Sequence, residues 1–96
     1  MERKKLSPDE IEGHLADLEG WRAEDGKLLK SFKFPDFAGS LDFVNKAGAI
    51  AERYDHHPDI TFGWGYADFT ITTHSEGGIT EKDFALAKEI DGIAEF

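Results

Sequence analysis

The N-terminal part of the chain has apolar residues at helical spacing. Ile11, Leu15 and Leu18 recur at intervals of four and three residues, which is typical of one face of an amphipathic helix. Ser7–Glu10 has the form of a capping box with proline in the first turn, and Gly20 is a suitable C-terminal stop. The pattern therefore predicts a first helix between Ser7 and Gly20.

Two stretches further along the chain have the pattern of β-hairpins. Segments 21–24 and 28–34 flank Asp25-Gly26, a dipeptide suited to a tight turn. Segments 60–64 and 67–73 alternate between apolar and other residues, with glycines near their connection. We expect two antiparallel strand pairs.

The segment between the hairpins predicts a long helix that begins at Phe37, directly after Pro35-Asp36. It carries two apolar stripes about a quarter turn apart, which is more apolar surface than one sheet normally covers, and a partner subunit could cover the rest. One stripe consists of Phe43, Ala47, Ile50 and Tyr54, and the second stripe of Phe37, Leu41, Val44, Gly48 and Ala51.

A last helix is expected from the capping sequence 80–83 onward, and the whole order is α-β-β-α-β-β-α. This order favours an α+β fold, a four-stranded antiparallel sheet with three helices packed on one face. The open sheet leaves edge strands that pairing between subunits would protect. Because 96 residues are near the lower limit for one hydrophobic core, we expect 1–96 to form a single domain. The buried arc of the last helix is expected at Leu86, Ala87, Ile90, Ile93 and Ala94.

Composition narrows the possible chemistry. The formal net charge of −9 opposes binding to nucleic-acid phosphates and to anionic lipid surfaces, so neither nucleic acid nor a membrane is an expected partner. The absence of cysteine excludes disulfides and thiolate chemistry, and it fits a reducing compartment. No apolar run has the length of a signal peptide or a membrane span, so we expect a cytoplasmic location.

Three of the four histidines lie at the ends of the second predicted hairpin. His56 and His57 precede its first strand and His74 follows its second, and antiparallel pairing brings both positions to the same end of the sheet. His74 is on the strand face opposite the apolar one, which keeps it out of the core. Imidazole titrates near neutral pH, so the trio indicates proton transfer. Glu52, four residues before His56, and Asp55 could reach an imidazole and fix its orientation.

Other interpretations of the polar and aromatic residues stay open. The histidines could be ordinary cap or turn residues, or they could bind zinc, although no two histidines lie one helical turn apart. His14 is expected to be solvated. Trp64 and Tyr66 could stack on a flat heterocycle or belong to the core. Gly77-Gly78 could bind an anion ahead of a helix or could simply form a turn.

The spacing of these residues resembles the signature of the pterin-4a-carbinolamine dehydratase family, over nearly the whole chain. Thr73-His74, Gly77-Gly78-Ile79-Thr80 and Leu86-Ala87 also look like that family. The anchors, in chain order, are Glu52, His56-His57-Pro58, Trp64, His74 and Asp83. The gaps between successive anchors are three, five, nine and eight residues.

The resemblance implies dehydration of a 4a-hydroxytetrahydropterin to quinonoid dihydropterin, as in recycling of tetrahydrobiopterin after aromatic amino acid hydroxylation. It also implies a homodimer or homotetramer and no metal or organic cofactor. His56 and His74 match the family's acid–base histidines and His57 a substrate-binding one, so these three are the catalytic candidates. The substrate-binding candidates are Glu52, Asp55, Pro58, Trp64, Thr73 and Asp83.

Two alternative functions stay open. Some mammalian relatives of the family also bind a nuclear transcription factor and stabilise its dimer, so the second stripe of the central helix could instead dock a protein partner as a coactivator would. The same fold could also act on another pterin.

Overall fold

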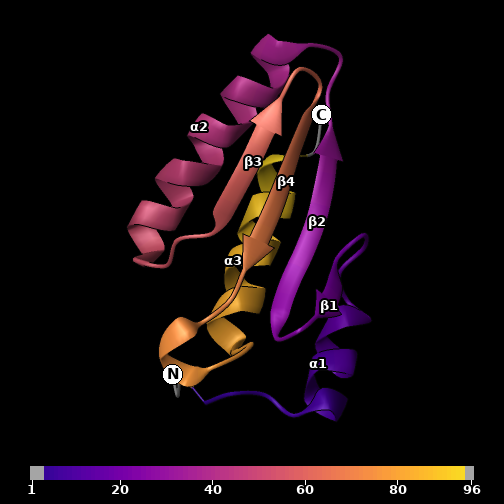
Figure 1. Cartoon of the computed structure of the whole chain (residues 1–96), viewed down its shortest axis with the longest axis vertical. Helices are drawn as coiled ribbons and strands as arrows, with labels where there is room; N and C mark the ends of the chain where they lie inside the picture. The colour runs from indigo at the N-terminus through magenta and orange to yellow at the C-terminus, as the bar shows by residue number, and fades with distance from the viewer. Residues whose placement is uncertain (1–3, 95–96) are drawn as a thin grey trace.

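The computed structural model describes residues 4–94, which form three α-helices and an antiparallel sheet (Figure 1). The predicted order and the α+β class are confirmed, with one additional 3-10 turn, η1, before the last helix. The elements are α1 (Pro8–Leu15), β1 (Arg22–Glu24), β2 (Lys27–Lys33), α2 (Phe37–Tyr54), β3 (Asp59–Gly63), β4 (Tyr66–Ile71), η1 (His74–Glu76) and α3 (Glu81–Ile93).

The four strands pair in the order β1-β2-β4-β3. Asp25 and Gly26 connect β1 to β2 with φ of 50° and 75°, the positive values that a tight hairpin turn of this type requires. In the second hairpin Asp59 pairs with Thr70, and Gly63 with Tyr66. The start of β3 and the end of β4 therefore lie together at one end of the sheet, as the sequence predicts.

The hydrophobic core lies between the sheet and the helices. α2 and α3 cover one face of the sheet, and α1 lies beside the β1 edge (Figure 1). The apolar residues of the central strands that face the core are buried, because alternate positions of a strand point to one face. The core includes Leu28, Phe32, Ala67, Phe69 and Ile71 from the sheet, Phe43, Ala47 and Ile50 from α2, and Leu86, Ala87 and Ile90 from α3.

The first helix is shorter and less buried than the other two. α1 ends at Leu15, before the predicted stop at Gly20, and it has no buried residue. Its half-buried side chains pack against the edge of the core. His14, expected to be solvated, instead stacks on Phe84 of α3 with 4.7 Å between ring centroids.

The second stripe of α2 is only partly covered. Ala51 is buried, but Phe37 and Leu41 keep 45% and 40% of their surface exposed. Trp64, predicted at the end of a strand, lies in the β3–β4 turn and is 71% exposed, so it does not belong to the core of the chain. No helix within the described part of the chain combines the length and apolarity needed to cross a membrane.

Candidate active site

A shallow pocket of about 260 Å³ lies where β3 begins and β4 ends. All three histidines of the predicted trio contribute to its wall, which confirms that folding gathers them around one space. The lining residues are Asp55, His56, His57, Thr72, Thr73, His74 and Ser75.

The end of α2 positions two of these histidines. Asp55 terminates the helix in the left-handed region, with φ 51° and ψ 44°, a conformation that residues other than glycine and asparagine seldom adopt. The N–H of His56 then donates to the carbonyl of Ala51 at 3.1 Å, which closes the last turn. The chain leaves the helix axis at this point, and His56 and His57 diverge into different surroundings.

His56 forms a buried pair with Asp83 of α3. The distance from His56 Nε2 to Asp83 Oδ1 is 2.5 Å, and the two side chains are 10% and 0% exposed. Solvent therefore screens this pair weakly, and the carboxylate fixes the orientation of the ring. Nδ1 is the ring nitrogen that Asp83 does not engage.

The other oxygen of Asp83 belongs to a buried polar cluster. Asp83 Oδ2 accepts from Thr80 N–H at 2.8 Å and from the Thr73 hydroxyl at 2.9 Å. The Thr73 and Thr80 hydroxyl oxygens are 2.9 Å apart. Thr80 is the N-cap of α3, and Asp83 is the acidic residue of its capping box. One carboxylate thus caps α3 and holds His56.

His57 forms a second, exposed pair. Its Nε2 lies 2.5 Å from Glu52 Oε2, and the side chains are 55% and 76% exposed. The predicted reach of Glu52 to an imidazole is confirmed, but its partner is His57, one residue beyond the helical spacing that suggested His56. An ion pair this exposed contributes little to stability, so its effect is mainly to orient the ring.

The third histidine is exposed, as its position in the strand pattern predicts. His74 begins η1, and its carbonyl accepts from Gly77 N–H at 3.1 Å. Gly78 N–H donates to the carbonyl of Thr73 at 3.4 Å. Both glycine N–H groups are used within this turn, which favours the turn interpretation of Gly77-Gly78 over an anion site.

The substrate-binding candidates do not all reach the pocket. Asp55 and Thr73 line it, whereas Pro58, the residue after His57, is not among its lining residues. Asp83 is fully buried behind His56 and has no surface to offer a ligand. Trp64 lies at the opposite end of the hairpin, with the five residues of β3 between it and Pro58, about 17 Å of extended chain.

Thr80 is the residue of this buried cluster that the sequence interpretation did not name as a site candidate. The spacing of Thr80 and Asp83 did signal a capping box. What the sequence alone did not indicate is that the same carboxylate also contacts an imidazole from another element. Within residues 4–94 no group of three or more histidine and acidic side chains is arranged to hold a metal ion.

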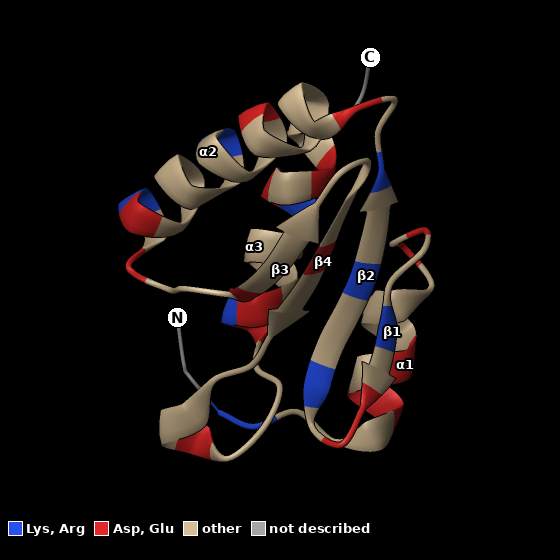
Figure 2. Cartoon of the chain, turned by 45° about the horizontal axis from the view of Figure 1, so that its top comes forward, with Lys and Arg blue, Asp and Glu red and all other residues tan. Residues whose placement is uncertain are grey.

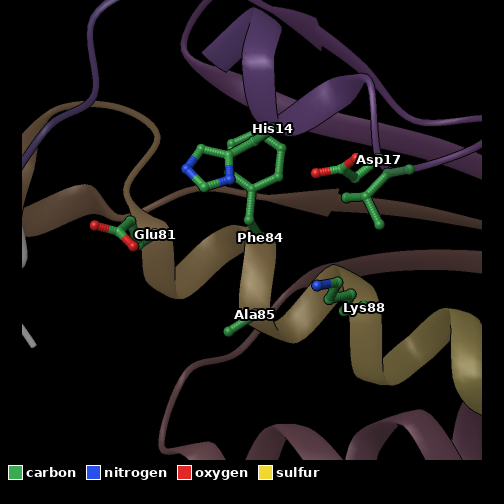
Figure 3. Close-up of a pocket in the computed structure, with 7 residues that line it drawn as sticks. His14, Asp17, Glu81, Phe84, Ala85 and Lys88 are labelled. Atoms are coloured by element: carbon green, nitrogen blue, oxygen red, sulfur yellow. The ribbon is translucent and has the colours of Figure 1, made fainter. Parts of the chain in front are cut away.

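A second cavity, of about 220 Å³, lies beside the contact of α1 with α3 and is lined by the fourth histidine, His14. Figure 3 shows His14 lying over Phe84, with Asp17 and Lys88 to one side and Glu81 to the other. The cavity mixes acidic and basic side chains and shares no lining residue with the histidine pocket. Acidic positions recur along the helices and in the turns, and β2 carries three lysines, Lys27, Lys30 and Lys33 (Figure 2).

Comparisons of sequence point to one family. A family model described as "Pterin 4 alpha carbinolamine dehydratase" matches residues 4–93. A Sulfolobus acidocaldarius protein provisionally named pterin-4-alpha-carbinolamine dehydratase is 48% identical over 89 residues, which is 93% of this chain and 98% of that protein. A Mycobacterium avium protein with the same provisional name is 46% identical over 88 residues, which is 92% of this chain and 94% of that protein.

Two solved structures share the fold. A crystal structure of a transcriptional coactivator/pterin dehydratase from Brucella melitensis matches with a TM-score of 0.92 at 36% identity, covering 96% of this chain and 100% of that one. A pterin dehydratase-like protein identified as a RuBisCO assembly factor in the alpha-carboxysome matches with a TM-score of 0.69 at 28% identity, covering 80% of this chain and 92% of that one.

Proposed function

The chain belongs to the pterin-4a-carbinolamine dehydratase family, and we propose that it catalyses loss of water from a 4a-hydroxytetrahydropterin to give quinonoid dihydropterin. The observation that carries this proposal is the pocket wall, to which His56, His57 and His74 all contribute. The activity is that of a carbon–oxygen lyase that uses histidine general acid–base catalysis, and it serves recycling of a tetrahydrobiopterin-type cofactor.

The chemistry needs one acid and one base. The C4a–O bond breaks as the acid gives a proton to the hydroxyl group, and water leaves. The base takes the proton from N5, and the electron pair of that N–H bond forms the C4a=N5 double bond. One proton is given and one is taken, so no external oxidant, reductant or cofactor is required. Imidazoles suit both roles, because each can hold or release a proton near neutral pH.

We assign the acid–base roles to His56 and His74 and substrate binding to His57. His56 is rigid because Asp83 holds one of its nitrogens, and His74 is exposed at the pocket wall. Glu52 orients His57 in the same way from outside. Preorganised groups of this kind lower the barrier without a further reorganisation cost.

The other candidates divide by position. Asp55 is proposed to contact the pterin directly, since it lines the pocket, and Pro58 is proposed to do so as the neighbour of His57 in the chain. Asp83 is too buried for such contact, and Thr73, although it borders the pocket, is 3% exposed and directs its hydroxyl to Asp83, so both are proposed to act through His56. Trp64 is too distant within one chain, so a role in substrate binding requires that a neighbouring subunit supply it.

Stopped-flow measurement of the dehydration of synthetic 4a-hydroxytetrahydropterin, followed by ultraviolet absorbance, tests the proposal. We expect His56→Ala and His74→Ala to lower the enzymatic rate by roughly 10²-fold or more while circular dichroism shows an intact fold. His14→Ala, which removes a histidine outside the pocket, is the matched control and should retain the rate. Unchanged rates in both pocket variants would reject the assignment.

A second candidate function, docking of a protein partner, is favoured by the exposed part of the α2 second stripe. Phe37 and Leu41 remain 45% and 40% exposed and lie one helical turn apart, so they form a contiguous apolar patch of the kind that marks contact with another protein. We propose that the partner is a second copy of this chain, so that self-association into a dimer or tetramer covers the two side chains. We also propose that the protein is cytoplasmic. A pull-down that captures a different protein, lost with Leu41→Lys, would instead support the docking function.

A further inference from the structure

We infer that the hydroxyl groups of Thr73 and Thr80 are positioning groups that orient Asp83 and, through it, the proton of His56. This inference rests on the proposed function and adds residues that act from behind the pocket. The three side chains Thr73, Thr80 and Asp83 are 3%, 0% and 0% exposed, so none can act by extended contact with a substrate.

The donors and acceptors of the cluster can be assigned by counting protons. Ionised Asp83 can only accept, so the Thr73 hydroxyl uses its single proton on Asp83 Oδ2 at 2.9 Å. The contact of 2.9 Å between the two hydroxyls must then have Thr80 as the donor. Thr80 Oγ1 in turn accepts from Lys82 N–H at 3.2 Å. The bonds therefore run in one direction, from the first turn of α3 through two hydroxyls to the carboxylate.

The same count assigns the tautomer of His56. With both carboxylate oxygens acting as acceptors, His56 Nε2 at 2.5 Å from Oδ1 must carry the hydrogen. Neutral His56 then has its lone pair on Nδ1, the nitrogen available to take a proton from a ligand. If the carboxylate rotates or shifts, this preference weakens, and the ring loses its alignment with the substrate.

Within the described residues every buried side-chain polar atom has a hydrogen-bond partner, including those of this cluster. Partly satisfied buried networks are costly, which makes a complete one rigid. Loss of either hydroxyl should thus disturb the orientation of His56. Loss of the Thr73 hydroxyl should have the larger effect, because it contacts the carboxylate directly.

The test combines Thr73→Val, its rescue by Thr73→Ser, and Thr80→Val. We expect Thr73→Val to lower kcat on the order of 10-fold with little change in KM, because the substrate does not touch Thr73 through this hydroxyl. Thr73→Ser restores the donor and should recover most of kcat. Thr80→Val should give a smaller loss. In an Asp83→Asn background, Thr73→Val should lower kcat no further, since both changes act on one carboxylate.

Nitrogen NMR of the histidine rings gives a readout independent of turnover. Wild-type His56 should show the Nε2–H tautomer, and Thr73→Val should increase the Nδ1–H fraction, because the carboxylate that loses this bond can turn away from the ring. Asp36→Ala removes a helix cap at the distant end of α2 and should leave both the ring spectrum and kcat unchanged, which controls for general loss of stability.

An unchanged His56 tautomer together with an unchanged kcat in Thr73→Val would overturn the inference. A wild-type chain without dehydratase turnover would overturn the proposed function instead, and the tautomer measurement would still decide the role of the hydroxyls.

Discussion

Replacement of Asp83 by asparagine separates the structural and chemical roles of the buried carboxylate. Asparagine has the same shape but exchanges one acceptor oxygen for a donor NH₂ group. Its oxygen can replace Asp83 Oδ2, which in the wild type accepts from the Thr73 hydroxyl and from Thr80 N–H. The NH₂ group then faces His56 Nε2, so the imidazole must accept there and move its hydrogen to Nδ1. The fold keeps its bonds, whereas the pocket-side nitrogen loses its lone pair.

The expected loss of stability follows from the three hydrogen bonds that Asp83 accepts, from His56, the Thr73 hydroxyl and Thr80 N–H. Hydrogen bonds to a charged acceptor are worth about 1.5–3 kcal/mol each and neutral ones about 0.5–1.5 kcal/mol, so the exchange costs about 1 kcal/mol per bond. We expect Asp83→Asn to lose about 3 kcal/mol of stability and, for a chain of this size, at least about 10 °C in Tm. Asp83→Ala should lose about 5 kcal/mol, because it leaves three buried donors without an acceptor.

Calorimetry and stopped-flow kinetics test this prediction together. The proposed mechanism requires Asp83→Asn to lower the dehydration rate by roughly 10²-fold at temperatures where the variant is folded. Full activity in folded Asp83→Asn would show that the tautomer of His56 is irrelevant to the reaction. Equal destabilisation by asparagine and alanine would contradict the assignment of donors and acceptors.

Three further predictions concern other parts of the chain. Leu41→Lys places a charge on the exposed stripe of α2 and should shift a dimer or tetramer to monomers in sedimentation velocity; an unaffected oligomer would locate the interface elsewhere. The N–H of Ser7 donates to Glu10 and lowers the pKa of that carboxyl, so Glu10 stabilises α1 above its ordinary titration range and loses this effect as pH falls through the lowered pKa. The stability difference between wild type and Glu10→Gln in urea should therefore shrink in acid, and a constant difference would refute this cause. In the wild type the Lys30 ammonium lies 2.8 Å from Asp91 and its side chain is 18% exposed. Asp91→Ala removes the carboxylate and should lower the free energy of unfolding in urea by about 2 kcal/mol. A smaller loss of stability in Asp91→Ala than in the exposed Asp42→Ala would contradict this prediction.

The hydrophobic pattern predicts most of this fold because each signal is local. Asp25-Gly26 determines a turn by its own backbone preferences, and the change of apolar period at Phe37 marks the start of α2. The convergence of His56 and His74 follows from antiparallel pairing, which requires only that the two strands form one hairpin.

What the sequence could not predict depends on tertiary placement. The pairing of His56 with Asp83 joins residues 27 positions apart, and it exists because α3 packs beside the end of α2. Glu52 pairs with His57 because the left-handed turn at Asp55 displaces His56 from the helical spacing. His14 is half-buried against Phe84 because α1 lies against α3, which no periodicity of α1 itself reveals.

Nitrogen-15 NMR of the histidine rings, during titration with a stable 7,8-dihydropterin, measures the shared pocket directly. The four histidines provide their own control. The account predicts that the ring signals of His56, His57 and His74 shift along one binding curve while those of His14 stay fixed. Saturation without movement of the first three, or movement of His14 alone, would contradict it.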